Sequence, residues 1–138
     1  MGLLARREHS AVELFHKLRM RGYDEASIRA VIDALGKEGL QSDNRYTENY
    51  IHNRIGKGFG PVRIVQELRE KGVNDELISL HLAELEPDWL QLAGQARIKR
   101  FGPGLPQDFR EQAKQSRFLQ QRGFSGEYIS RLFKAGRV

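Results

Sequence analysis

Apolar residues recur at helical spacing through most of the chain. Between residues 10 and 21, Ala11, Leu14 and Leu18 lie on one face, and Ser10 with Glu13 forms a capping box at the start. Similar spacing, with turn residues between segments, predicts further helices over 24–37, 42–55, 61–71, 74–85, 87–101, 107–122 and 125–135. No stretch alternates with period two over six or more residues. The pattern therefore predicts an all-helical protein of eight helices.

A short sequence pattern occurs three times, around Gly22, Gly72 and Gly123. Each copy has a leucine four residues before the glycine, a basic residue immediately before it and an apolar residue immediately after it. A helix N-cap residue and then an isoleucine follow, namely Asp24 and Ile28, Asn74 and Ile78, and Ser125 and Ile129. Repeats of this length are typical of stacked helical units. We therefore expect units at 1–55, 56–102 and 103–138, the last truncated to two helices.

A glycine-rich basic loop, Gly56-Lys57-Gly58-Phe59-Gly60, separates two predicted helices, and Pro61 suits the first turn of the second. Each glycine would cost a helix about 1 kcal/mol relative to alanine, which favours a turn. The loop lacks the Lys-Ser/Thr pair and the preceding strand of a nucleotide-binding P-loop. Two interpretations stay open: a connector in which Phe59 fills the gap between units, or a basic loop that lets Lys57 approach a phosphodiester.

The positive charge is unevenly distributed. The chain of 138 residues has a formal net charge of +5, and residues 87–138 hold ten Lys and Arg against four Asp and Glu. Residues 51–72 are also basic, with a net charge of +3. Clusters of this kind suit a polyanion such as nucleic acid, because neutralising phosphates releases counterions. The alternative is a solvated basic face that has no partner.

We nominate the basic residues of these two regions as a surface for DNA or a DNA-bound filament. The nominated set is twelve of these residues, namely Arg54, Lys57, Arg63, Arg69, Lys71, Arg97, Lys99, Arg100, Arg110, Lys114, Arg117 and Arg122. Phe101, Phe118 and Phe124 lie among them, but their spacing favours helix packing over base stacking. We therefore expect contacts to phosphates without readout of the bases.

Catalytic, metal and cofactor chemistry find little support. The chain has no cysteine, and its four histidines stand at no metal-ligand spacing; His81 falls at a core position of the repeat. No catalytic residue, metal or cofactor is predicted, and we expect a protein that is not an enzyme. The N-terminus lacks the apolar region of a signal peptide, and no run approaches the ~20 apolar residues of a membrane span. These features favour a cytoplasmic protein, and we expect it to act as a monomer.

Several blocks of sequence carry a family resemblance. The most specific is Lys57-Gly58-Phe59-Gly60-Pro61 with Glu67-Leu68 and Lys71-Gly72 at fixed offsets. Weaker blocks extend it over essentially the whole chain: Arg7-Glu8-His9-Ser10, Glu38-Gly39-Leu40, Asp88-Trp89, Arg100-Phe101-Gly102 and Arg122-Gly123-Phe124. In these blocks the chain resembles the RecX family, bacterial regulators of the recombinase RecA.

The resemblance implies a tandem array of three-helix repeats, elongated and curved, that docks in the groove of the RecA filament on single- or double-stranded DNA. There it would lower the recombinase, ATPase and coprotease activities of RecA, in DNA recombination, DNA repair and the SOS response. Two other hypotheses remain. The chain could be a sequence-nonspecific or helix-turn-helix DNA-binding protein that acts without RecA. It could also be a helical scaffold without nucleic acid, in which case salt would hardly affect binding.

Overall fold

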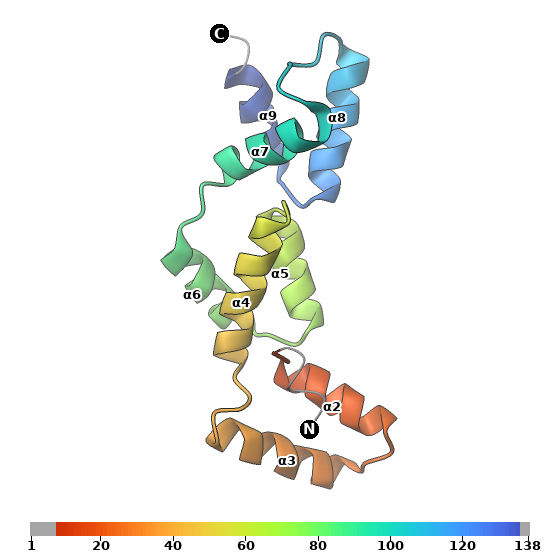
Figure 1. Cartoon of the computed structure of the whole chain (residues 1–138), viewed down its shortest axis with the longest axis vertical. Helices are drawn as coiled ribbons and strands as arrows, with labels where there is room; N and C mark the ends of the chain where they lie inside the picture. Colours follow the sequence, from red (N-terminus) through yellow and green to blue (C-terminus); the bar gives the residue numbers. More distant parts are fainter. Residues whose placement is uncertain (1–7, 136–138) are drawn as a thin grey trace. The chain divides into compact units, whose positions relative to one another are not determined.

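The computed structural model describes residues 8–135, and this part of the chain contains eight helices and no strand (Figure 1). The all-helical prediction is confirmed. The helices are α2 (Ala11–Met20), α3 (Glu25–Lys37), α4 (Asp43–Gly56), α5 (Pro61–Glu70), α6 (Asp75–Leu85), α7 (Trp89–Phe101), α8 (Phe109–Gln121) and α9 (Gly126–Ala135).

The threefold sequence pattern corresponds to one kind of helix ending. Gly22, Gly72 and Gly123 all have a positive φ, of 95°, 81° and 97°. At Gly72, the glycine N–H donates to Arg69, and the next N–H, of Val73, donates to the carbonyl of Leu68. This is a Schellman motif, in which the residue after the glycine packs against the residue four positions before the glycine. The leucine and the flanking apolar residue of the pattern therefore have a physical role in ending α2, α5 and α8.

The helix starts follow from capping side chains. Ser10 and Glu13 form the predicted capping box at the start of α2. The predicted start at Pro87 was wrong: α7 begins at Trp89, because the side chain of Asp88 accepts a hydrogen bond of 3.1 Å from the N–H of Gln91 and is the N-cap. Pro87 thus precedes the cap.

The chain divides into two compact units. Unit 1 comprises residues 1–50 and 67–84, and α2 packs against α3 within it. Leu14, Ile28, Leu68 and Ile78 are buried there, each at most 2% exposed. His81 is also buried, with a ring nitrogen against the side-chain oxygen of Asn44, so the core position expected for His81 is confirmed.

Unit 2 comprises residues 51–66 and 85–138. Helices α7, α8 and α9 pack against one another within it (Figure 1). Their core contains Ala93 and Leu119, which are fully buried, with Phe124, Ile129 and Phe133. The single tryptophan, Trp89, packs against this core from the first turn of α7. These contacts make α7, α8 and α9 one three-helix bundle.

No helix within residues 8–135 is long and apolar enough to cross a membrane.

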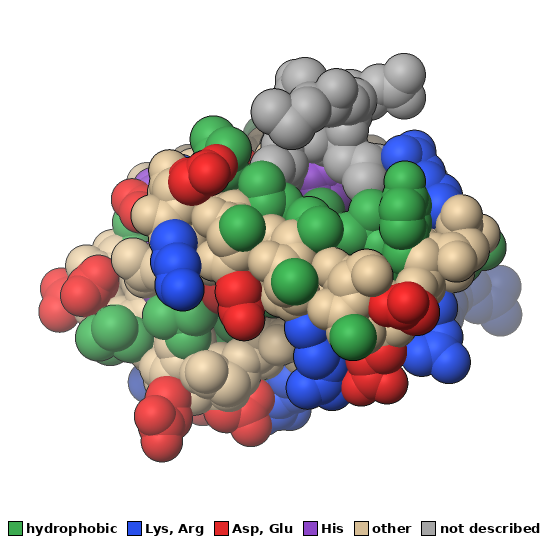
Figure 2. Space-filling view, turned by 90° about the horizontal axis from the view of Figure 1, so that it is seen from below, with side chains coloured by type: hydrophobic (Ala, Val, Ile, Leu, Met, Phe, Trp, Pro, Cys, Tyr) green, Lys and Arg blue, Asp and Glu red, His purple; other side chains and the backbone are tan. Residues whose placement is uncertain are grey.

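The face of unit 1 over α3 carries hydrophobic side chains among acidic and basic ones (Figure 2). Met20, Tyr23 and Val31 are exposed in this unit, at 89%, 57% and 46%. This face is therefore mixed in character rather than uniformly charged.

Candidate nucleic-acid interface

The two units differ in charge. Unit 1 holds ten Lys and Arg against thirteen Asp and Glu, a net charge of −3. Unit 2 holds thirteen against five, a net charge of +8. A surface that binds phosphates is therefore expected on unit 2.

The glycine-rich loop is fixed within unit 2 by a close backbone contact. Gly58, at φ 86°, ends α4 with the same Schellman motif, because the N–H of Phe59 donates to the carbonyl of Arg54. The N–H of Gly60 then donates to the carbonyl of Arg122 at 2.7 Å, and that of Val62 to Gly123 at 2.9 Å. The loop therefore lies directly against the turn between α8 and α9.

This contact requires glycine on both sides. A Cβ atom added at Gly60 would lie 2.6 Å from the carbonyl carbon and oxygen of Gly123. One added at Gly123 would lie 2.3 Å from the Cβ of Arg63 and 2.6 Å from its backbone nitrogen. Because these contacts are shorter than real Cβ atoms make, the glycines allow the two backbones to meet.

Three arginines surround the ring of Phe59. The guanidinium carbons of Arg54, Arg63 and Arg122 lie 3.7, 4.5 and 4.6 Å from the ring centroid. Arg63 also donates to the carbonyl of Gln121 at 3.0 Å. Cations at these distances are attracted by the electrons of the aromatic face. Phe59 therefore gathers positive charge from α4, α5 and the end of α8 at one place.

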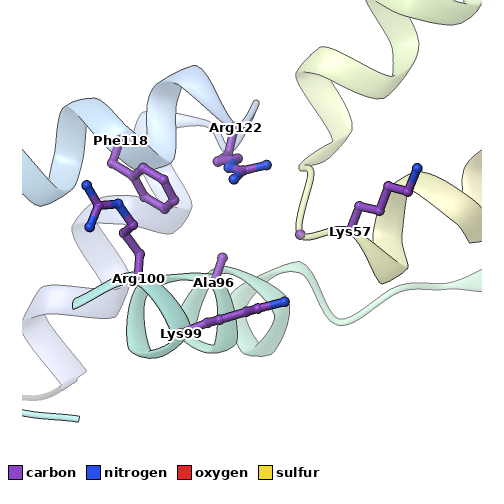
Figure 3. A pocket seen from close by; sticks show the side chains of 7 residues that line it. Lys57, Ala96, Lys99, Arg100, Phe118 and Arg122 are labelled. Carbon is purple, nitrogen blue, oxygen red and sulfur yellow. The ribbon is translucent and has the colours of Figure 1, made fainter. Parts of the chain in front are cut away.

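A pocket of about 210 Å³ lies beside this cluster (Figure 3). Its lining comes from the loop after α4, the second half of α7 and the end of α8: Lys57, Gly58, Ala96, Lys99, Arg100, Phe118 and Arg122. Four of the seven residues are basic and none is acidic. We call it the basic pocket.

Aromatic rings hold two of the four cations. The guanidinium of Arg122 lies 5.2 Å from the ring centroid of Phe118, in addition to its contact with Phe59. Arg100 lies 5.3 Å from Phe101 and 5.9 Å from Phe118, and the two rings meet edge to face. In the part of the chain that the structure describes, Lys57, Lys99, Arg100 and Arg122 form no ion pair with a carboxylate.

Arg97 differs from the other nominated residues. It is only 4% exposed, and its guanidinium donates to the carbonyls of Gly104 and Pro103 and to the side-chain oxygen of Gln115. The seven-residue connection between α7 and α8 is rich in glycine and proline, and Arg97 holds it against α8. We therefore remove Arg97 from the candidate surface, because burial keeps its charge from a phosphate.

The remaining nominated residues lie outside the basic pocket. Arg110, Lys114 and Arg117 are exposed on α8, with the amino group of Lys114 6.0 Å from the ring centroid of Phe101. Arg69 and Lys71 belong to unit 1, where Arg69 pairs with Asp75 at 2.7 Å and Lys71 with Glu13 at 3.6 Å. Because these carboxylates neutralise both cations, we remove Arg69 and Lys71 from the candidate surface as well. The structure thus brings together Arg54, Lys57, Arg63, Lys99, Arg100 and Arg122.

Sequence reasoning missed the part that Phe59 and Phe118 play. Both rings were expected to fill gaps or pack helices, and Phe118 does pack on the core of unit 2. Arg54 and Arg63, which lie five residues before and four residues after Phe59, were the available signal. The contact with Arg122, 63 residues later, has no local counterpart in the sequence.

Three sequence models of one family match the chain in order. They describe the first, second and third three-helix domains of RecX and match residues 1–35, 42–82 and 86–133. The chain belongs to the RecX family. The third matched range contains α7, α8 and α9, which pack as one bundle. The units predicted from the sequence are 1–55, 56–102 and 103–138. Each predicted boundary lies one helix later along the chain than the matching boundary between the family models, and the last predicted unit therefore has only two helices.

Curated relatives agree with this assignment. A regulatory protein RecX of Halorhodospira halophila is 46% identical over 127 residues, which covers 92% of this chain and 79% of the relative. One from Pseudomonas fluorescens is 46% identical over 132 residues, covering 96% and 85%. The relatives are thus named as regulatory proteins.

Two crystal structures share the fold. A structure of regulatory protein RecX has a TM-score of 0.79 at 24% identity; the match covers 94% of this chain and 66% of the other, just under two thirds of its length. RecX from Lactobacillus salivarius has a TM-score of 0.76 at 24% identity, covering 96% and 88%. At this identity the likeness shows the fold alone.

Proposed function

We propose that this RecX-family chain regulates the RecA recombinase by binding the RecA filament on DNA, mainly as an inhibitor. Binding lowers the recombinase, ATPase and coprotease activities of RecA, and so modulates DNA recombination, DNA repair and the SOS response. The protein does this in the cytoplasm, as a monomer and without catalysing a reaction. Membership of the RecX family supports the RecA part of the proposal.

The observation that carries the DNA part is the charge of unit 2. Its net charge of +8 contrasts with −3 for unit 1, and four of its cations line one pocket without an acidic neighbour in the lining. Phosphates on single- or double-stranded DNA neutralise such a surface and release counterions. Contacts to DNA and to RecA subunits within one complex also strengthen each other through effective concentration.

The test compares two substrates by fluorescence anisotropy of labelled single-stranded DNA. The protein is added either to bare DNA or to a preassembled, ATP-bound RecA filament, at the same moderate salt concentration. Tighter binding to the filament, followed by loss of the filament signal and of ATP hydrolysis, is the expected result. RecA without DNA is the control for contacts that need no filament.

A second candidate is direct DNA binding without RecA, which the basic pocket also favours. It predicts equal or higher affinity for bare DNA and an unchanged filament, and that outcome would refute the proposed regulation. Binding to the filament that does not respond to salt would instead favour a helical scaffold that does not contact nucleic acid.

A further inference from the structure

We propose that the basic pocket holds one phosphate group of the nucleic-acid backbone, and that Phe59 and Phe118 are positioning residues that aim Arg122 and Arg100 at it. This inference rests on the proposed function, because it assigns to particular side chains one of the phosphate contacts that filament binding requires. It adds the site, its ligand chemistry and the part played by the rings.

The composition of the pocket favours an anion. Four cationic side chains, Lys57, Lys99, Arg100 and Arg122, line the pocket of about 210 Å³ together with Gly58, Ala96 and Phe118 (Figure 3). Like charges gathered in this way repel one another, and the repulsion is relieved when an anion enters. No carboxylate within residues 8–135 pairs with these four side chains, so this part of the chain does not supply that anion.

The repeat offers an internal comparison within unit 1. Lys71 precedes Gly72 as Arg122 precedes Gly123, so the two residues are equivalent. The two carbonyls bond to residues at equivalent positions of the repeat: that of Lys71 accepts from the side-chain hydroxyl of Ser10 at 2.7 Å, and that of Arg122 accepts from the backbone N–H of Gly60 at 2.7 Å.

The side chains at these two contacts differ in charge. Lys71 pairs with the carboxylate of Glu13 at 3.6 Å. The residue three after Gly60, in the place that Glu13 occupies three after Ser10, is Arg63. The contact in unit 1 is thus an opposite-charge pair, whereas the one in unit 2 combines two cations with the ring of Phe59. This difference identifies Lys71 as the matched control for Arg122.

The rings make the pocket selective for phosphate over a base. Arg122 lies against Phe59 and Phe118, and Arg100 lies against Phe101 and Phe118. Phe118 therefore already contacts two guanidinium groups, which favours a part in positioning cations over stacking with a nucleobase. A planar guanidinium held by a ring loses less freedom when it donates to a phosphate, which is an advantage that lysine does not share.

The experiment measures the affinity of the full chain for a labelled single-stranded oligonucleotide at several salt concentrations. Each phosphate contact contributes about 0.7 to the slope of log affinity against log salt, or about 2.6-fold between roughly 50 and 200 mM salt. We expect Lys57→Gln and Arg100→Gln each to weaken binding and to reduce the slope by a part of this amount, up to about 0.7, because the pocket holds one phosphate. Lys71→Gln, the control, should leave the slope unchanged, because Glu13 already neutralises that charge.

The positioning residues have a different expected effect. Phe118→Leu keeps every charge, so it should weaken binding about twofold to fivefold while the slope stays the same. Arg122→Lys gives the same readout without touching the core, since it keeps the charge and loses the planar group that stacks on the rings. If both variants bind with wild-type affinity, the positioning role is refuted.

Two outcomes would overturn the assignment of the pocket. The first is a wild-type slope in Lys57→Gln and Arg100→Gln. The second uses inorganic phosphate as probe and measures the melting temperature of the protein at matched ionic strength. If phosphate stabilises the wild type but not Arg100→Gln, and Arg100→Gln leaves the salt slope for the oligonucleotide unchanged, the ligand of the pocket is a free phosphate. In either case the RecA proposal stands if the wild-type protein still binds and disassembles the filament, so the two failures are distinguishable.

Discussion

At the contact between Gly60 and Gly123, replacing glycine with alanine should destabilise unit 2 more than at its other glycines. In Gly60→Ala the new Cβ would lie 2.6 Å from the carbonyl carbon and oxygen of Gly123 and 2.7 Å from the nitrogen of Phe124. All three are backbone atoms, so no side-chain rotation can relieve the overlap. The loop or the turn between α8 and α9 has to move.

The expected loss of stability is about 1–3 kcal/mol by either available route. If the backbones stay in place, inserting a methyl group into packed structure costs about 1–3 kcal/mol. If they separate, the hydrogen bonds from Gly60 to Arg122 and from Val62 to Gly123 are lost, at about 0.5–1.5 kcal/mol each. The two estimates agree because both describe the same close approach.

Urea denaturation followed by the fluorescence of Trp89 measures this loss, because the only tryptophan of the chain packs in unit 2. Gly56→Ala is the matched control: it lies in the same loop region at the end of α4, and an added Cβ would have no atom within 4 Å. It should be neutral or stabilise by up to about 1 kcal/mol. A Gly60→Ala protein as stable as Gly56→Ala would refute the packing argument.

Two further predictions concern Arg97 and Asp24. Arg97→Met removes donors to Gly104, Pro103 and Gln115 and should lower the free energy of unfolding by about 1–3 kcal/mol in urea titrations. DNA affinity of the folded variant should hardly change, and a large loss of affinity in a stable protein would contradict burial. Hydrogen bonds from the backbone and side chain of Ser27 lower the pKa of the Asp24 carboxyl below its ordinary value of 3.8. The ionised Asp24 caps α3, so its full contribution to the stability of the folded protein is present above pH 3.8. That contribution is lost as the pH falls through the lower pKa of the folded state. Circular dichroism between about pH 5 and pH 2 should show this loss in the wild type and less of it in Asp24→Ser, whose cap does not titrate; identical acid transitions would contradict it.

Much of the fold could be predicted because its causes are local. The leucine, glycine and apolar residue around Gly22, Gly72 and Gly123 specify a Schellman ending, and Asp24 and Asn74 cap the next helix through their own side chains. The start of α7 was misplaced by two residues because Pro87 and Asp88 are both compatible with a helix start, and only the geometry of the cap distinguishes them.

The phase of the repeat could not be read from self-similarity. A series of similar helices can be divided after any member, and the sequence pattern marks the turn between the last two helices of each family domain. Packing decides the division, since α7, α8 and α9 share the core around Ala93 and Leu119. A bundle is defined by which helices bury the same apolar residues.

The candidate site divides in the same way. Composition alone placed the excess charge in 51–72 and 87–138 and excluded cysteine chemistry. It could not separate Arg97, which is buried, from Arg100, which lies one helical turn further on and lines the basic pocket. Arg97 and Arg100 are three residues apart on α7, and nothing in the sequence distinguishes them. Arg97 is buried because the connection between α7 and α8 covers it.

The sequence by itself determined the helices and their capped ends, because each depends on residues within about one or two turns of each other. The threefold repeat and the sign of the net charge can be counted in the sequence directly. The tertiary structure decided which cations meet. Arg54, Arg63 and Arg122 converge on Phe59 because glycines at 60 and 123 let two distant backbones touch. That contact joins residues more than sixty positions apart, and long-range packing, unlike helix capping, leaves no local pattern to read.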